Sequence, residues 1–138
     1  MVNVIDLKKA TSEFFSKFCK KEAFGEFPEW SSRWEFKGSL PNNERKGCYA
    51  ILCGDEVIYV GLGISNSNKG SGIGSRVSKY WMSTNEVING ERKYISTSND
   101  ITSIITLPFE NGTYYLAAAL EVYLIYNLKL KNNKSYSN

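Results

Sequence analysis

The sequence contains no histidine. This absence excludes Ser-His-Asp and Cys-His nucleophilic catalysis, zinc sites with histidine ligands and any imidazole general base. Acid–base chemistry in this chain must therefore come from carboxylates, tyrosines, lysines or bound water.

Cysteine is scarce, and long apolar runs are missing. Three cysteines form no Cys-x-x-Cys pair, and their odd number argues against a disulfide scaffold. We interpret them as free thiols in a reducing cytosol, and we expect a cytoplasmic protein without a signal peptide. The longest apolar run, Leu116–Ile125, is too short to cross a bilayer and contains Glu121, so no membrane partner is expected.

The composition is that of one globular domain. The chain has 138 residues, of which 42% are hydrophobic and 22% charged, and its net charge is +3. A chain of this length buries roughly two-thirds of the surface that its unfolded form exposes, so it needs no disulfide or metal for stability. The chain contains neither an internal repeat nor a linker.

The hydrophobic pattern predicts a small α+β sandwich. The strands are expected over 47–53, 56–61 and 101–109, with a further short strand near 33–37. The helices are expected over 6–23, from Ile73 through Trp81, and from Leu116 to about Leu130. Residues 62–72 form a predicted polar, glycine-rich loop, and residues 83–100 are polar and turn-rich.

The first 46 residues are expected to form a helical and aromatic extension that packs on a core made by residues 47–138. Aromatic side chains are dense between Phe24 and Phe36. Burial preference favours the interpretation that they seal the core, and stacking against nucleic-acid bases is the alternative.

Residues that can carry chemistry gather on and after the predicted hairpin. Gly47-Cys48-Tyr49 lies on its first strand and Tyr59-Val60-Gly61 on its second. Arg76 and Tyr80 are four apart on a predicted helix, so they share one face. Glu121 lies on the apolar face of the last helix, where a carboxylate is costly unless a cation or hydrogen bonds compensate it.

This arrangement resembles the GIY-YIG endonucleases. The family combines Gly-x-Tyr, a spacer of about ten residues and Tyr-[Ile/Val]-Gly with a helical arginine, a later glutamate and a final asparagine. Gly74–Tyr80 is similar to the corresponding helix of the bacterial nucleotide-excision-repair incision subunit, in which a tyrosine also follows the arginine by four. The resemblance covers residues 47–133 and implies a central, mostly antiparallel three-stranded sheet flanked by helices.

The resemblance also implies an activity, the metal-dependent hydrolysis of phosphodiester bonds by an endonuclease, with DNA as the expected substrate. It implies that Tyr49 deprotonates the attacking water, that Tyr59 is its hydrogen-bonding partner and that Arg76 stabilises the transition state. Glu121 would bind a single Mg²⁺ or Mn²⁺, and Tyr80 would lie beside the scissile phosphate. A local cation would have to lower the pKa of the catalytic phenol, which is ordinarily near ~10.

Further residues are expected to support the site or to bind nucleic acid. The supporting residues are Gly47, Gly61 and Asn133, with Asn132 as the alternative to Asn133. The lysines expected to contact phosphates are Lys69, Lys79, Lys129 and Lys131, in stretches that contain no acidic residue.

The hairpin turn decides whether the two tyrosines share a site. A Gly54-Asp55 turn with uninterrupted pairing would place Tyr49 and Tyr59 on opposite faces of the sheet. A three-residue loop or a bulge would pair Ile51 with Tyr59 and bring both phenols to one face. The implied mechanism needs the second arrangement, so we predict it.

One departure from the family pattern keeps a second hypothesis open. Many members have lysine directly after Tyr-[Ile/Val]-Gly, and this chain has Leu62. The alternative is a catalytically degenerate nucleic-acid-binding module of the same fold. A small structural protein without affinity for nucleic acid is a third possibility, and the sequence gives no indication of the oligomeric state.

Overall fold

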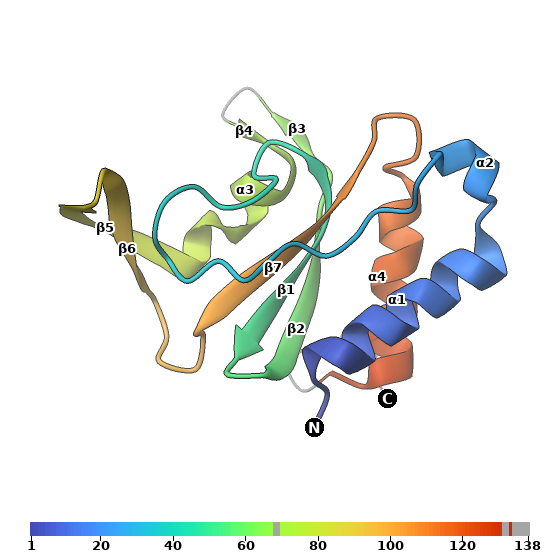
Figure 1. The fold of residues 1–138 in the computed structure, drawn as a ribbon, viewed down its shortest axis with the longest axis horizontal. Helices are drawn as coiled ribbons and strands as arrows, with labels where there is room; N and C mark the ends of the chain where they lie inside the picture. Colours follow the sequence, from blue (N-terminus) through green and yellow to red (C-terminus); the bar gives the residue numbers. More distant parts are fainter. Residues whose placement is uncertain (68–69, 131–132, 134–138) are drawn as a thin grey trace.

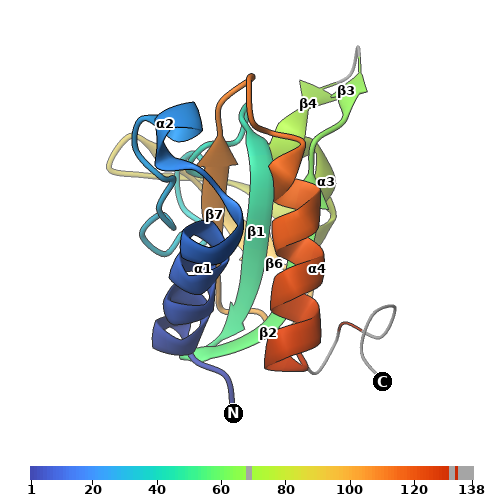
Figure 2. The same cartoon turned by 90° about the vertical axis from the view of Figure 1, so that its right-hand side faces the viewer.

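A three-stranded antiparallel sheet forms the middle layer of the computed structural model, which describes residues 1–67, 70–130 and 133. The helices are α1 (Val4–Phe18), α2 (Lys21–Phe24), α3 (Gly72–Val77) and α4 (Leu116–Leu128), with a 3₁₀ turn η1 (Ser78–Tyr80). The strands are β1 (Lys46–Cys53), β2 (Glu56–Gly63), β3 (Asn66–Ser67), β4 (Gly70–Ser71), β5 (Trp81–Ile88), β6 (Glu91–Ser96) and β7 (Ser103–Phe109). Helices α1 and α4 cover one face of the sheet, and α3 with the β5–β6 hairpin lies on the other (Figures 1 and 2).

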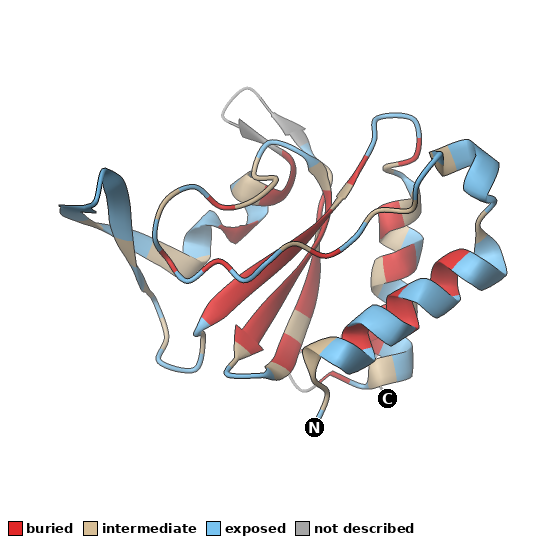
Figure 3. Ribbon diagram, viewed as in Figure 1, coloured by how far each residue is buried: buried red, intermediate tan, exposed pale blue. Residues whose placement is uncertain are grey.

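The sheet has the order β2-β1-β7, and both pairs are antiparallel. The α+β class and the three-stranded antiparallel sheet predicted from the sequence are therefore confirmed. Strand β1 is central and is buried from Gly47 to Leu52, because packed layers cover both of its faces (Figure 3). Strand β2 is an edge strand, so one side of its backbone is not paired within the sheet.

Helices α1 and α4 enclose one hydrophobic core against the sheet. Side chains of Cys48, Ala50 and Leu52 alternate along β1 toward this core. Helix α1 begins at a capping box in which Asn3 and Asp6 each accept a hydrogen bond from the other's backbone N–H. Its apolar stripe contacts α4, and the rings of Phe14 and Tyr123 are 5.5 Å apart. The N-terminal extension thus packs on the rest of the chain.

A second core lies on the opposite face, between the sheet and α3. Tyr49 and Ile51 point into it from β1, and Ile73 and Val77 meet them from α3. Trp34 is 4% exposed within this core. The aromatic side chains before the sheet therefore contribute to both hydrophobic cores, Trp30 to the first and Trp34 and Phe36 to the second, as burial preference predicted.

The single helix predicted over 6–23 is broken at Cys19 and Lys20 into two helices. Helix α1 ends at Phe18, Cys19 and Lys20 are extended, and α2 is a separate short helix. Rings from the following segment pack back onto α1, with Phe27 stacked 4.8 Å from Phe15. This tertiary packing outweighs the local preference for a longer helix.

The strand predicted near 33–37 is absent as a continuous element. Only isolated bridges join Trp34 to Ile104 and Lys37 to Lys93. Phe36 between them has a φ of 67°, which interrupts an extended strand.

The interpretation of residues 73–100 requires the largest correction. Helix α3 ends at Val77, and Trp81 begins a strand instead of continuing the helix. Residues 83–100 contain most of the β5–β6 hairpin, although their composition is polar. The overlooked signal is Asn89-Gly90, whose φ values of 52° and 80° are those of a two-residue hairpin turn.

The loop predicted over 62–72 contains the short strand pair β3–β4, and the other elements agree with the pattern to within a few residues. Helix α4 ends at Leu128, strand β7 starts at Ser103, and β2 continues to Gly63 in the predicted loop. None of the helices in the described ranges is long and apolar enough to span a membrane.

Candidate active site

Tyr49 and Tyr59 lie on the same face of the sheet. Cys53 pairs with Glu56 across a tight Gly54-Asp55 turn, and the register then shifts so that Ile51 pairs with Tyr59. The shift makes Ile58 a bulge residue without a partner on β1. The two-residue turn and the predicted pairing of Ile51 with Tyr59 are therefore both present. The extra residue Ile58 reverses the alternation of faces along β2, so Tyr59 points to the same face as Tyr49.

Two glycines make room for this arrangement. Gly61 pairs with Tyr49, and a Cβ atom on Gly61 would overlap the Tyr49 ring. The phenol can therefore lie over the edge strand. Gly47 is equally constrained on the other side of β1, where a Cβ atom would overlap the carbonyl oxygen of Leu107 in β7. Any larger residue at either position would push strands or the tyrosine ring apart.

Tyr80 joins the two tyrosines from η1. Its ring centroid is 6.3 Å from that of Tyr49, and the rings of Tyr49 and Tyr59 are 6.1 Å apart. The two phenols are neighbours: burial and then the adjacent Tyr80 raise the pKa of Tyr49, and burial raises the pKa of Tyr80.

Arg76 and Glu121 come from helices on opposite faces of the sheet (Figure 1). Both α3 and α4 pack against β2, so the two helices flank the strand that forms the open edge. The Arg76 guanidinium lowers the pKa of Glu121 and those of Tyr49 and Tyr80. Within the described part of the chain, however, no ion pair involves either charged side chain. They are close enough to interact electrostatically but are not in contact.

Burial opposes ionisation at this site. It raises the pKa of Glu121, and the opposing effect of Arg76 is smaller. It also raises the pKa of Tyr49, to which Tyr80 and Tyr59 add, and Tyr49 is only 1% exposed. The Cys48 thiol points from β1 into the core on the face opposite to Tyr49. Its pKa is raised mainly by burial and to a lesser extent by the Glu121 charge. Tyr49 and Tyr80 are therefore neutral phenols at neutral pH.

Asn133 attaches the end of the chain to the edge strand. Its Oδ1 accepts a hydrogen bond of 2.9 Å from the Val60 N–H, and its Nδ2 donates one of 2.8 Å to the Val60 carbonyl. The side-chain amide thus pairs with β2 as a neighbouring strand would. Val60 lies between Tyr59 and Gly61, so this contact fixes the backbone beneath the three tyrosines.

The four lysines expected to bind nucleic acid are not gathered at one place. Lys79 is exposed, and its Nζ lies 5.3 Å from the centroid of the Tyr80 ring, next to the site. Lys129 is exposed at the C-terminal end of α4, two turns beyond Glu121. Lys69 and Lys131 lie outside the described residues.

The described side chains of the site could hold a hard cation weakly through the Glu121 carboxylate, and they do not form a metal site with several protein ligands. In residues 1–67, 70–130 and 133, no group of three acidic, cysteine or histidine side chains converges. Glu121 offers one half-buried carboxylate that forms no salt bridge with any described lysine or arginine. Mg²⁺ commonly binds through one or two carboxylates, keeps several waters and takes further oxygens from a substrate phosphate.

Two side chains beside this site were missed by the sequence patterns. Trp81 directly follows Tyr80, and Tyr94 faces it from β6, with their rings 6.2 Å apart. The pattern places Trp81 at the end of a predicted helix and Tyr94 in the polar segment 83–100, so it does not indicate the hairpin that brings them together. The Asn89-Gly90 turn would have paired their strands.

Comparison with known proteins adds no relative: no family model, no curated protein and no solved structure matches the chain. The chemistry of the site therefore has to be inferred from its residues. Together they offer phenols for proton transfer, a guanidinium for an anion and a carboxylate for a hard cation.

Proposed function

We propose that this protein is a divalent-metal-dependent endonuclease of the GIY-YIG type that hydrolyses phosphodiester bonds, with DNA as substrate. The observation that carries the proposal is the bulge at Ile58, which places Tyr49 and Tyr59 on one face beside Tyr80. Bulges are over-represented at sheet edges and next to active sites, where they re-aim side chains. Arg76 and Glu121 interact electrostatically at the same edge of the sheet, as hydrolysis of an anionic diester requires.

The gap between Arg76 and Glu121 is the proposed position of the scissile phosphate. Arg76 would donate hydrogen bonds to the non-bridging oxygens, where negative charge accumulates in the transition state. Glu121 would hold Mg²⁺, which supplies Lewis-acid stabilisation of the phosphoryl group and of the departing oxygen. The phosphate charge would also relieve the repulsion between the Arg76 guanidinium and a cation bound at Glu121.

The closeness of the Tyr49 and Tyr80 rings, together with burial that keeps both phenols protonated, supports a proton relay in place of a preformed phenolate. The Tyr49 oxygen keeps lone pairs that can accept a proton from the attacking water. In the same step Tyr49 passes its own proton to Tyr80, and half-buried Tyr80 releases its original proton to solvent. No isolated phenolate forms in the buried site. Tyr59 would orient the water.

The experiment incubates the purified protein with supercoiled plasmid, single-stranded DNA and RNA in Mg²⁺, Mn²⁺ or EDTA. Glu121→Gln serves as the matched control, because it keeps the side-chain shape and removes the charge. We expect cleavage of DNA with either metal, none in EDTA and none by the variant. Equal cleavage by the variant would refute the role of Glu121.

A nucleic-acid-binding module without catalysis is the second candidate. The observations that favour it are Leu62 in place of lysine and the burial that raises the pKa of Tyr49. It predicts salt-sensitive retardation of nucleic acid in a gel, unchanged by metal and without cleavage. Absence of binding at low salt would exclude both candidates.

A further inference from the structure

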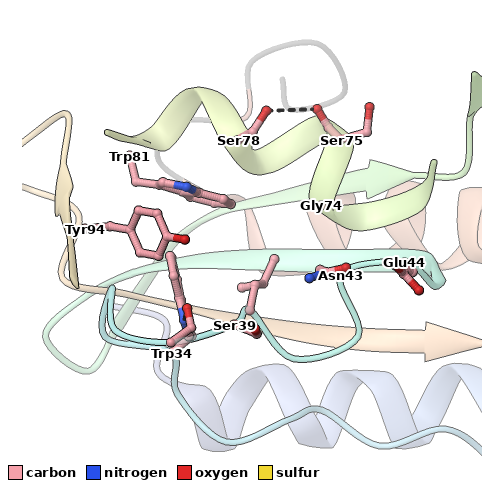
Figure 4. A pocket seen from close by; sticks show the side chains of 11 residues that line it. Trp34, Ser39, Asn43, Glu44, Gly74, Ser75, Ser78, Trp81 and Tyr94 are labelled. Atoms are coloured by element: carbon pink, nitrogen blue, oxygen red, sulfur yellow. Dashed lines mark hydrogen bonds between the residues drawn. The ribbon is translucent and has the colours of Figure 1, made fainter. Parts of the chain in front are cut away.

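A pocket of about 410 Å³ lies between α3 and the loop that carries Ser39, Asn43 and Glu44 (Figure 4). Trp34, Trp81 and Tyr94 line one end of it, and the loop that carries Ser39, Asn43 and Glu44 lines the wall opposite α3. Its volume is within the range of small-molecule sites. It is separate from the candidate active site, because neither Arg76 nor any of the three clustered tyrosines lines it.

The aromatic end of the pocket is rigidly held. Trp34 is almost fully buried, its Nε1 donates a hydrogen bond of 3.1 Å to the Gly38 carbonyl, and its backbone pairs with Ile104. Trp81 packs edge-on against Trp34 with centroids 4.8 Å apart, and Tyr94 lies 5.9 Å from Trp34. Trp81 and Tyr94 are only half-buried, so parts of their rings remain accessible to a ligand.

The polar wall offers hydrogen bonds without positive charge. Glu44 is the one charged residue among the described residues that line the pocket, and no lysine or arginine takes part. The Asn43 carbonyl accepts a hydrogen bond of 2.7 Å from the Gly74 N–H, which anchors the loop to α3. The Asn43 side-chain amide forms no hydrogen bond to another described residue. This chemistry suits a neutral, planar, polar ligand and does not suit a phosphate.

The segment from α3 to η1 forms one wall of both sites. Gly74, Ser75 and Ser78 line the pocket, whereas Arg76 and Tyr80 belong to the candidate active site. A ligand that reaches both sides of this short helix therefore needs an anionic group for Arg76 and a neutral ring for the pocket. A nucleotide within a strand has both.

We propose that the pocket receives one unpaired nucleobase of the substrate strand while a neighbouring phosphate lies at Arg76. This inference rests on the proposed function, because it assigns that function a substrate preference. Aromatic rings stack on bases of any sequence, and the Asn43 amide and Glu44 carboxylate can bond a base edge. Removing a base from a duplex costs unstacking and unpairing energy, so mismatched, looped or single-stranded positions are the preferred substrates.

The first test uses free deoxynucleosides and needs no cleavage. Deoxyadenosine, deoxycytidine, deoxyguanosine and thymidine are titrated separately while the tryptophan indole N–H signals are followed by NMR. The chain has three tryptophans, and Trp30 is an internal control because its indole bonds Thr11 in the other core. We expect saturable shifts for Trp34 and Trp81 with at least one nucleoside and none for Trp30. Equal shifts of all three signals, or no saturation, would overturn the pocket assignment.

Three variants test the contacts. Trp81→Ala removes a stacking surface, and it is expected to weaken nucleoside binding about tenfold or more. Asn43→Ala and Ser39→Trp alter the loop wall without touching the core, the second by filling the pocket, so they keep the test valid if Trp81→Ala fails to fold. Asn127→Ala, on exposed α4 surface, is the matched control. Unchanged binding by a folded Ser39→Trp protein would refute the proposal.

A second test separates this inference from the proposed activity. Duplexes carrying 2-aminopurine in a mismatch or in a matched pair are mixed with the protein in EDTA, and the fluorescence of that base is recorded. Occupation of the pocket predicts a base signal that changes more for the mismatch and that Ser39→Trp abolishes. Nucleoside binding without DNA cleavage in Mg²⁺ would support the pocket and refute the nuclease. Cleavage of DNA without a fluorescence change that depends on the pocket would support the nuclease and refute the pocket.

Discussion

Tyr49 on the central strand lies directly opposite Gly61 on the edge strand, and its ring occupies the space that a side chain at Gly61 would fill. This relationship explains why a tyrosine and a glycine are needed at these two positions. The ring leans over β2 toward the unpaired side of the sheet, where α3 and α4 also meet the strand. A phenol in the middle of a sheet thereby reaches its edge.

Gly61→Ala should displace the Tyr49 ring. A methyl group there would overlap the ring, and overpacking of this kind costs about 1–3 kcal/mol. We expect a lower denaturation midpoint and DNA cleavage reduced by about tenfold or more. Gly112→Ala is the matched control, since its Cβ would have no neighbour within 4 Å, and its stability should change by less than about 0.5 kcal/mol. Equal effects of the two substitutions would contradict the packing argument.

Replacing the tyrosines one at a time tests the proton relay. Tyr49→Phe removes both the proton acceptor and the proton donor to Tyr80 in the proposed relay, so cleavage should fall by about 10²–10⁴-fold in a folded protein. Tyr80→Phe breaks the second step of the relay and should also slow cleavage. Tyr126→Phe, exposed on α4, is a control that should leave the rate unchanged.

The pH profile distinguishes the relay from a phenolate. Burial raises the pKa of Tyr49 and of Tyr80, so a mechanism that needs a phenolate would speed up about tenfold for each pH unit through the alkaline range. The relay uses neutral phenols and predicts a nearly flat profile from about pH 7 to 9. A steady rise in the single-turnover rate across that interval would exclude the relay.

The sequence predicted those parts of the fold that depend on local periodicity. Strong apolar alternation and a tight turn located β1 and β2, and a continuous apolar run located α4. The pairing of β1 with β2 could be predicted because side chains alternate between the two faces of a sheet. Tyr49 and Tyr59 must lie either on one face or on opposite faces, and only the first arrangement forms a shared site.

Tertiary contacts decided the parts that the sequence did not predict. Trp81 has helical spacing after Ile73, but packing on Trp34 and pairing with Ser96 hold it in a strand. The break after Phe18 depends on the rings of Phe24 and Phe27, which fold back and pack on Phe15 of α1. No sequence pattern could indicate the pocket, because its walls come from a loop, a short helix and a hairpin.

Arg76→Ala should affect two measurable properties. Because the guanidinium lowers the pKa of Glu121, its removal should shift the carboxyl titration to higher pH, as followed by ¹³C NMR. Loss of donors to the phosphoryl oxygens should slow cleavage by about 10²–10³-fold. Lys79→Ala is the matched control, because that exposed cation should affect binding more than rate. An unshifted Glu121 titration would show that the two groups do not interact.

Asn133→Ala should loosen the edge strand. It removes both hydrogen bonds to Val60, and leaving these buried backbone groups unpaired costs about 1–3 kcal/mol for each. Amide hydrogen exchange at Val60 should accelerate. Asn127→Ala is the control, since among the described residues that exposed amide bonds the carbonyl one turn back in its own helix, and exchange in β2 should be unaffected.

Glu121→Gln should raise stability while abolishing cleavage. Burial raises the folded-state pKa of Glu121, so the folded protein binds this proton more tightly than the unfolded chain. The contribution of the protonated form is fully present below the ordinary carboxyl pKa and is lost as the pH rises through the raised value. At neutral pH the ionised carboxylate therefore destabilises the fold. The neutral glutamine avoids this cost, and its advantage in melting temperature should grow from pH 4 to pH 7.

Magnesium should reverse the predicted order of the two melting temperatures, so that the wild type becomes more stable than Glu121→Gln. A ligand that binds only the folded state stabilises it in proportion to the logarithm of its concentration, so Mg²⁺ should raise the melting temperature of the wild type and not of Glu121→Gln. Cleavage by the variant should fall by about 10³-fold or more, because several kcal/mol of transition-state stabilisation is lost with the metal. Retardation of DNA in EDTA should be nearly unchanged. If Mg²⁺ stabilised both proteins equally, the cation would bind elsewhere, and the carboxylate at the edge of β2 would have no role as its ligand.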